Sequence, residues 1–129
     1  MAKRLKQKGV EPDHFISSPA KRALKTAKYF ADEFGFKKND IELIEALYGA
    51  NSPEFLKAVS DINDKYQAVA LFSHNPGITD FASSLTNVRI DNMPTCAIFA
   101  LQIEADSWKD FSNSEKKFLF FDYPKNPLG

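Results

Sequence analysis

The sequence predicts one α/β domain over residues 1–129, a three-layer sandwich with a mainly parallel central sheet. Apolar, strand-like runs alternate with segments of helical periodicity along most of the chain. The run at residues 68–72 is continuously apolar, which is typical of a strand covered on both faces by helices. A chain of 129 residues can bury one sizeable core and is too short for two ordinary domains.

The first two predicted elements are the end of a helix and a short strand. Residues 1–9 end in several basic residues and Gly9, and basic residues suit a last turn while glycine suits the left-handed position beyond it. No cap or first turn precedes this helix end. A short strand is expected at about residues 14–17.

The longest predicted helix begins near Ser18, which can cap it, and Pro19, which fits its first position. Gly35 can end this helix. Its apolar residues recur at helical spacing and form one face: Ala20, Ala23, Leu24, Ala27, Phe30, Ala31 and Phe34.

The rest of the chain continues the alternation of strands and helices. We expect a strand at 41–47, a helix beginning at Ser52-Pro53, a strand at 68–72, a helix at 76–85, a strand at 97–104, a polar turn region at 106–115, a strand at 117–122 and a tail at 123–127. Two prolines deny the tail the donors that a strand needs.

Composition argues against several classes of partner. Seventeen basic residues balance seventeen acidic ones, so no net positive field favours nucleic acid or a membrane. No apolar run reaches the ~18 residues of a membrane span, and we expect a cytoplasmic protein. The single Cys96 excludes an internal disulfide and a multi-cysteine metal cluster, and two distant histidines are weak evidence for zinc.

Two stretches, residues 15–23 and 68–77, share one layout: an apolar strand, a polar break and a proline that opens a helix. The start of a helix offers free N–H groups and positive dipole charge to an anion. Arg22 lies in such a first turn, where a cation costs up to ~1 kcal/mol unless an oxyanion compensates. The alternative is a solvated surface arginine, comparable to neighbouring Lys21.

His74 closes the strand at 68–72 and precedes Asn75-Pro76-Gly77. A histidine at a strand end can donate to phosphate or transfer protons, although it can also simply bond a loop carbonyl. Glu45, in the expected strand at 41–47, is a candidate proton donor if it is partly buried, and otherwise an exposed carboxylate.

Three further polar residues have structural interpretations. His14 lies at a strand start, where a structural role is expected. Capping of the helix is sufficient to explain Ser18, and a phosphate contact is the alternative. Cys96 runs into an apolar strand with no evident base beside it, so a small buried apolar role is expected.

Three segments together resemble signatures of the histidine phosphatase superfamily. They are SSPAKRALKTA at 17–27, SHNPG at 73–77 and NMPTCA at 92–97. The second is similar to the form found in SixA-type phosphohistidine phosphatases. This resemblance implies a phosphoglycerate-mutase-like fold and a phosphatase that forms a phospho-enzyme. The implied substrate is a phosphohistidine-containing protein or a small phosphoester, with no metal or organic cofactor.

The resemblance also implies roles for single residues. Arg22 would bind the phosphoryl oxygens as they gain charge, and His74 would donate to the same oxygens. Ser18 and Asn75 are included as further phosphate-binding residues. Glu45 would match a proton-donating glutamate of phosphoglycerate mutases, on which SixA-type members depend less.

The chain departs from the family at its start. The family begins with a strand that ends in Arg-His and supplies the nucleophile, and this sequence contains no Arg-His pair. The expectation is therefore an N-terminally truncated domain without the first strand and most of the first helix. Because that strand lies inside the sheet beside residues 68–72, we expect self-association through the gap. The alternative functions are a catalytically silent phosphate- or anion-binding module and a structural interaction domain.

Overall fold

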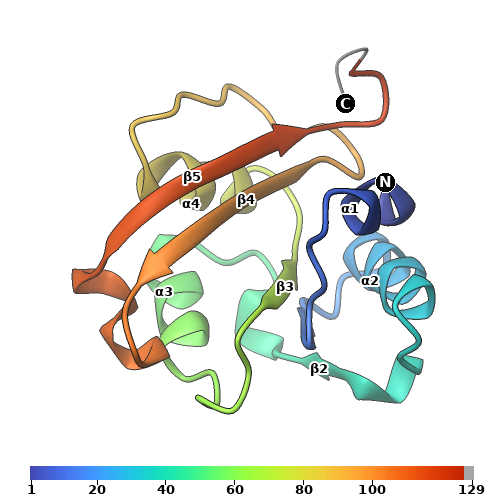
Figure 1. Cartoon of the computed structure of the whole chain (residues 1–129), viewed down its shortest axis with the longest axis horizontal. Helices are drawn as coiled ribbons and strands as arrows, with labels where there is room; N and C mark the ends of the chain where they lie inside the picture. The colour runs from blue at the N-terminus through green and yellow to red at the C-terminus, as the bar shows by residue number, and fades with distance from the viewer. Residues whose placement is uncertain (127–129) are drawn as a thin grey trace.

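The computed structural model describes residues 1–126 of the chain. Figure 1 shows the arrangement of its helices and strands. In chain order they are α1 (Ala2–Gln7), β1 (His14–Ser17), α2 (Lys21–Glu33), η1 (Lys38–Asp40), β2 (Ile41–Leu43), η2 (Glu45–Leu47), α3 (Ser52–Ser60), β3 (Val69–Phe72), α4 (Gly77–Leu85), β4 (Ile98–Glu104), η3 (Trp108–Asn113) and β5 (Glu115–Asp122).

The strands form two sheets. Strands β2, β1 and β3 lie in that order in a parallel sheet, with Phe15 opposite Ile41 on one side and Ala70 on the other. Strands β4 and β5 form a separate antiparallel pair with an irregularity between Ala100 and Leu101. The α/β class and the parallel sheet are confirmed. No ladder joins β3 to β4 among the described residues, and this interruption lies beside residues 68–72, where the sequence predicts a gap.

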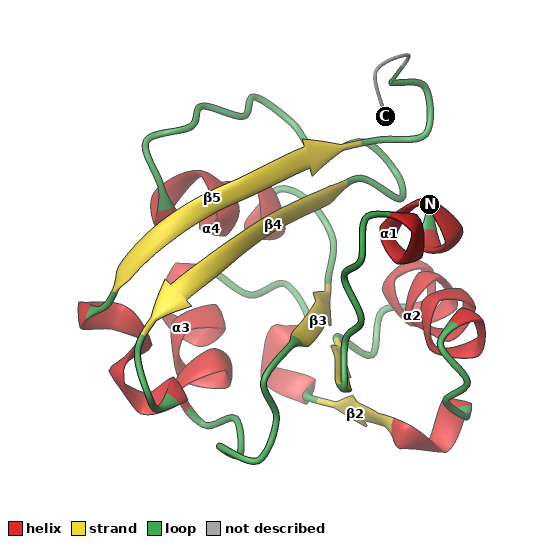
Figure 2. Ribbon diagram, viewed as in Figure 1, coloured by secondary structure: helices red, strands yellow, loops and turns green. Residues whose placement is uncertain are grey.

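Helices cover both faces of the parallel sheet, as Figure 2 shows, with α1 and α2 on one side and α3 and α4 on the other. Successive strand residues point to opposite faces. Phe15 therefore packs in a cluster with residues of α1 and α2, whereas Ile16 packs in a second cluster with residues of α3 and α4. Both side chains are almost completely buried. The three predicted layers are present.

Glycines end two of the helices where the sequence places them. Gly9 and Gly35 both have φ near +80°, the left-handed conformation expected just beyond a helix. The start of α2 differs from expectation, because Ser18 Oγ accepts from the Ala20 N–H (3.1 Å) and the helix begins at Lys21. Ser18 therefore stabilises the turn before the helix.

The strand expected at residues 41–47 is shorter in the structure. The last backbone bond from this segment to β1 is donated by Ile44 N–H to the Ser17 carbonyl (3.1 Å). Leu47 N–H then donates to the Ile44 carbonyl (3.1 Å), which turns the chain into η2. Leu47 is fully buried, so its apolar character reflects burial in this turn and does not indicate an extended strand.

Strand β3 is only half-buried at every one of its positions, Val69–Phe72. The continuous apolar run predicts a strand covered on both faces, and its residues do join both clusters. Its incomplete burial has a structural reason, because β3 pairs with β1 on one edge and, within residues 1–126, with no strand on the other.

Helix α1 and the end of β5 meet at one buried carboxylate, that of Asp122. Arg4 Nη1 of α1 lies 3.0 Å from Asp122 Oδ1 at the end of β5, and Asp122 is buried. Burial alone would raise the pKa of the Asp122 carboxyl, but hydrogen bonds from Asn126 and from the Tyr123 N–H, with the Arg4 charge, lower its pKa overall. Of the predicted tail, residue 127 lies outside the described residues.

No helix among residues 1–126 combines the length and the apolar character that crossing a membrane requires. No cluster of three His, Cys, Asp or Glu side chains in residues 1–126 is suited to a metal ion.

Candidate functional site

The candidate site lies where the three parallel strands end. β1, β2 and β3 end at Ser17, Leu43 and Phe72, so the segments that follow them meet at one edge of the sheet. Ligands of open α/β sheets bind beyond the carboxyl ends of the strands. Here the first segment leads to the start of α2, and the third leads through His74 to the start of α4.

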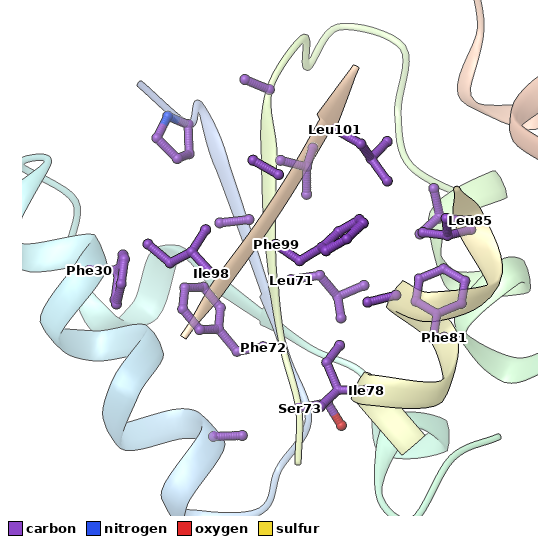
Figure 3. A pocket seen from close by; sticks show the side chains of 18 of the residues that line it. Phe30, Leu71, Phe72, Ser73, Ile78, Phe81, Leu85, Ile98, Phe99 and Leu101 are labelled. Carbon is purple, nitrogen blue, oxygen red and sulfur yellow. The ribbon is translucent and has the colours of Figure 1, made fainter. Parts of the chain in front are cut away.

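Arg22 and His74 line the same cavity, which has a volume of about 1510 Å³ and continues between β3 and β4. Figure 3 shows part of this cavity, with Ser73 near one end. Arg22 is exposed in the first turn of α2, and that turn contains no acidic residue. No ion pair or hydrogen bond to another described residue engages its guanidinium group. The unfavourable position of this cation at a helix start is therefore uncompensated within the described protein.

The His74 ring is held against Tyr48, with ring centroids 5.8 Å apart and planes inclined at 60°. Its Nδ1 atom is buried and has no hydrogen-bond partner in the described structure. Buried polar atoms are normally paired, and unpaired ones are characteristic of places where a ligand or water completes the contacts. Because His74 also lines the cavity, its imidazole can offer a hydrogen bond to a group bound there.

Asn75 is occupied by contacts within the protein. Its Nδ2 donates to Asn92 Oδ1 (3.0 Å) and to the Met93 carbonyl (2.9 Å), and its Oδ1 accepts from the Thr79 hydroxyl. Thr79 Oγ1 also accepts from the Met93 N–H (3.0 Å). Both Asn75 amide hydrogens thus hold the segment at 92–93 against α4. Asn75 lines the cavity, but its side-chain amide is engaged in these contacts, so they support a positioning role, and its predicted phosphate contact stays a prediction.

Ser18 does not reach the cavity. Its side chain is completely buried, and it is absent from the residues that line the cavity. Its hydroxyl accepts from the Ala20 N–H, and its carbonyl accepts from Ser17 Oγ (2.8 Å). These contacts stabilise the turn before α2, whose N-cap is Ala20, so Ser18 does not cap the helix as the sequence suggests, and it does not make the suggested phosphate contact either.

Glu45 is exposed at the start of η2 and does not line the cavity. The burial that would suit it to proton donation is therefore missing. Sequence reasoning did not single out Tyr48, from the same turn, which lines the cavity and contacts His74 although it is 66% exposed. The signal for it was the pair Tyr48-Gly49, since Gly49 adopts φ +66° and turns the chain at this point.

His14 and Cys96 complete the list of candidate residues. His14 lies at the start of β1, stacks on Tyr66 at 4.0 Å and pairs with Glu42 Oε1 through Nε2 (2.9 Å). Its expected structural role is confirmed. Cys96 is half-buried, lines the cavity and has φ +64°. The expectation of a small buried apolar role is met only in part, because Cys96 is half-buried in the turn that precedes β4.

Comparisons with known proteins identify a similar fold. The structure described as "Putative Phosphohistidine Phosphatase SixA" from Nakamurella multipartitia superposes with a TM-score of 0.78 at 15% sequence identity. The match covers 97% of this chain and 78% of that chain. No protein-family model matches the sequence, and neither does any curated protein. The likeness is one of fold, and it confirms the structural resemblance to SixA-type proteins.

Proposed function

We propose that the chain binds a phosphoryl group between Arg22 and His74 and belongs to a phosphohistidine phosphatase. The observation that carries this proposal is the cavity that both side chains line at the carboxyl edge of the parallel sheet. The guanidinium of Arg22 would neutralise the phosphoryl oxygens with charge-assisted hydrogen bonds. His74 would donate a further hydrogen bond as those oxygens gain charge in the transition state. The fold of the similar solved structure supports this assignment.

The starts of α2 and α4 add to the same binding site. Both helices begin directly after the strand ends that form this edge, and neither start has a side-chain hydrogen bond that caps it. Their unpaired N–H groups and positive dipole ends favour an anion. An oxyanion bound here would also offset the unfavourable interaction of the Arg22 charge with the positive dipole end of α2.

The nucleophile is the part that the described site lacks. The sequence contains two histidines, and His14 lies at the amino end of β1, away from the edge that carries His74. With His74 assigned as the hydrogen-bond donor, a phospho-enzyme mechanism needs a nucleophile that neither histidine supplies. For this reason a catalytically silent phosphate-binding module is the second candidate function.

Binding of inorganic phosphate and of vanadate, measured by calorimetry, tests the phosphoryl site. Arg22→Ala should weaken binding by at least ~1.5 kcal/mol, which is more than tenfold, because hydrogen bonds to charged groups are worth that much. Lys21→Ala is the matched control at the neighbouring exposed position and should have a much smaller effect. Equal losses in the two variants would mean that only general positive charge matters and would contradict the proposal.

Turnover tests the donor role proposed for His74. The 129-residue chain is expected to form no phospho-enzyme and to hydrolyse a phosphohistidine peptide or a small phosphoester very slowly. Robust turnover that survives in His14→Ala and vanishes in His74→Ala would show that His74 itself is the nucleophile, which contradicts the donor role proposed for it.

A further inference from the structure

Charge is unevenly distributed along the chain, although the net charge is zero. Ten of the seventeen basic residues and four of the seventeen acidic ones lie in residues 1–38, so the rest of the chain carries an equal excess of negative charge. Residues 1–38 include α1 and α2, which together cover one face of the parallel sheet, as Figure 2 shows. The positive charge of the protein is therefore concentrated in one of its two helical layers.

The outward face of α2 carries a row of lysines. Lys21, Lys25 and Lys28 follow one another at spacings of four and three residues, which places them side by side on one face of the helix. All three are exposed, and α2 lies at the outside of the molecule in Figure 1. The buried residues of α2 lie on its opposite face: Ala23, Ala27, Phe30 and Ala31. We call Lys21, Lys25, Lys28 and the exposed Tyr29 the basic face of α2.

The lysines of the basic face are unpaired within the described protein. No ion pair or hydrogen bond in residues 1–126 engages the ammonium group of any of the three. Asp32 follows Lys28 by four residues and forms no ion pair with it, whereas Lys6 of α1 lies 4.0 Å from Glu33. Like charges three and four residues apart destabilise a helix, and basic residues near its start oppose its dipole. Negative charge supplied from outside would relieve this repulsion.

The basic face begins at the candidate site. Lys21 lines the cavity together with Arg22, and Lys25 and Lys28 lie about 6 and 10 Å further along the axis of α2. A large molecule whose phosphoryl group enters between Arg22 and His74 therefore has the basic face within its reach. Tyr29, which is 66% exposed, follows Lys25 by four residues and adjoins it on the helix. Exposed tyrosines are typical of surfaces that bind proteins.

We propose that the basic face of α2 docks an acidic surface of the protein that carries the phosphoryl group. The proposal rests on the proposed function, because it assigns the face to the substrate of the Arg22–His74 site. Complementary charge speeds the encounter of two proteins and fixes their relative orientation. A nucleic acid fits less well, because the excess of acidic residues after residue 38 repels a polyanion that extends beyond α2.

Two synthetic peptides test the proposal on the full chain. Both carry a stable phosphonate analogue of phosphohistidine. In the acidic peptide four glutamates follow at helical spacing, and in the neutral peptide glutamines replace them. Fluorescence anisotropy should show that the acidic peptide binds at least about tenfold more tightly, because several surface ion pairs each add a small contribution. This preference should shrink as the salt concentration rises, since salt screens exposed charges.

Charge reversal locates the contact. Lys25→Glu combined with Lys28→Glu should remove the preference for the acidic peptide, and it should affect binding of inorganic phosphate far less than Arg22→Ala does, since neither lysine lines the cavity. Lys109→Glu combined with Lys117→Glu is the matched control, because both residues are exposed lysines outside α2 and the change in net charge is the same. The control should keep the preference. If the first pair does not fold, Lys25→Gln combined with Lys28→Gln takes its place.

The acidic peptide without the phosphonate separates this proposal from the proposed function. It should bind more weakly than the complete peptide, with the same sensitivity to reversal at Lys25 and Lys28. If inorganic phosphate does not bind, or binds equally well to Arg22→Ala, the phosphoryl site is refuted. The peptide without the phosphonate then still decides whether α2 docks an acidic surface.

Four results would overturn the proposal. A preference that is absent, or that survives reversal at Lys25 and Lys28, would show that the basic face is not the contact. An equal loss in the control pair would show attraction by net charge alone. Tighter binding of a random-sequence DNA duplex, lost on the same reversal, would make a nucleic acid the occupant. A dimer in light scattering that the reversal dissociates would make a second copy the occupant.

Discussion

Gly77→Ala should destabilise the protein because the position has no room for a side chain. Gly77 is the first residue of α4, and a Cβ atom there would overlap the Ala50 carbonyl oxygen and lie 3.3 Å from Phe55 Cε2. The obstacle is a backbone atom of a residue that is only 5% exposed, so it cannot rotate away. Overpacking of this kind costs ~1–3 kcal/mol. Alanine recovers at most ~1 kcal/mol through its higher helix propensity.

At the upper end of the overpacking range, Gly77→Ala should therefore lower the free energy of unfolding by roughly 2 kcal/mol. For a domain of this size that corresponds to a fall in Tm of roughly 6–10 °C. Thermal and urea unfolding followed by circular dichroism measure it. Because α4 begins three residues after His74, a shift of the helix should also weaken phosphate binding in calorimetry.

Ser84→Ala is the control, since Ser84 is an exposed residue in the last turn of the same helix. Its unfolding free energy should stay within ~0.5 kcal/mol of the unsubstituted protein, as is usual for surface positions. A Gly77→Ala protein as stable as this control, with normal phosphate binding, would refute the close approach of α4 to Ala50 and the reasoning built on it.

Three further substitutions test other parts of the fold. The folded Asp122 carboxyl has a pKa below its ordinary 3.8, so the stability that it contributes is present above about pH 4 and is lost as the pH falls. In an acid titration, the free energy of unfolding of Asp122→Asn should therefore fall less steeply than that of the unsubstituted protein. Thr79→Val removes the hydroxyl that bonds Asn75 and the Met93 N–H, and urea unfolding should show a loss of ~1–3 kcal/mol. Phe55→Ala empties a completely buried position and should cost ~3–5 kcal/mol in the same measurement; a loss below ~1 kcal/mol would contradict its place in the core.

Local sequence signals were sufficient for the elements whose structure is decided within a few residues. Gly9 and Gly35 mark helix ends because few other residues adopt a positive φ readily. Pro53 marks a helix start for a similarly local reason, its fixed φ and missing donor. The positions of Arg22 and His74 after strands also followed from the order of residues, because parallel strands bring their carboxyl ends to one edge.

Tertiary structure decided which polar groups remain available at that edge. The sequence alone did not show that the Asn75 amide bonds Asn92 and Met93, since these residues are far along the chain and meet only when α4 packs. Burial of Ser18 and exposure of Glu45 likewise depend on what the rest of the chain covers. The edge of β3 shows the same division: the departure from the family predicts a gap beside residues 68–72, but which helices and strands bound that gap depends on contacts between distant parts of the chain.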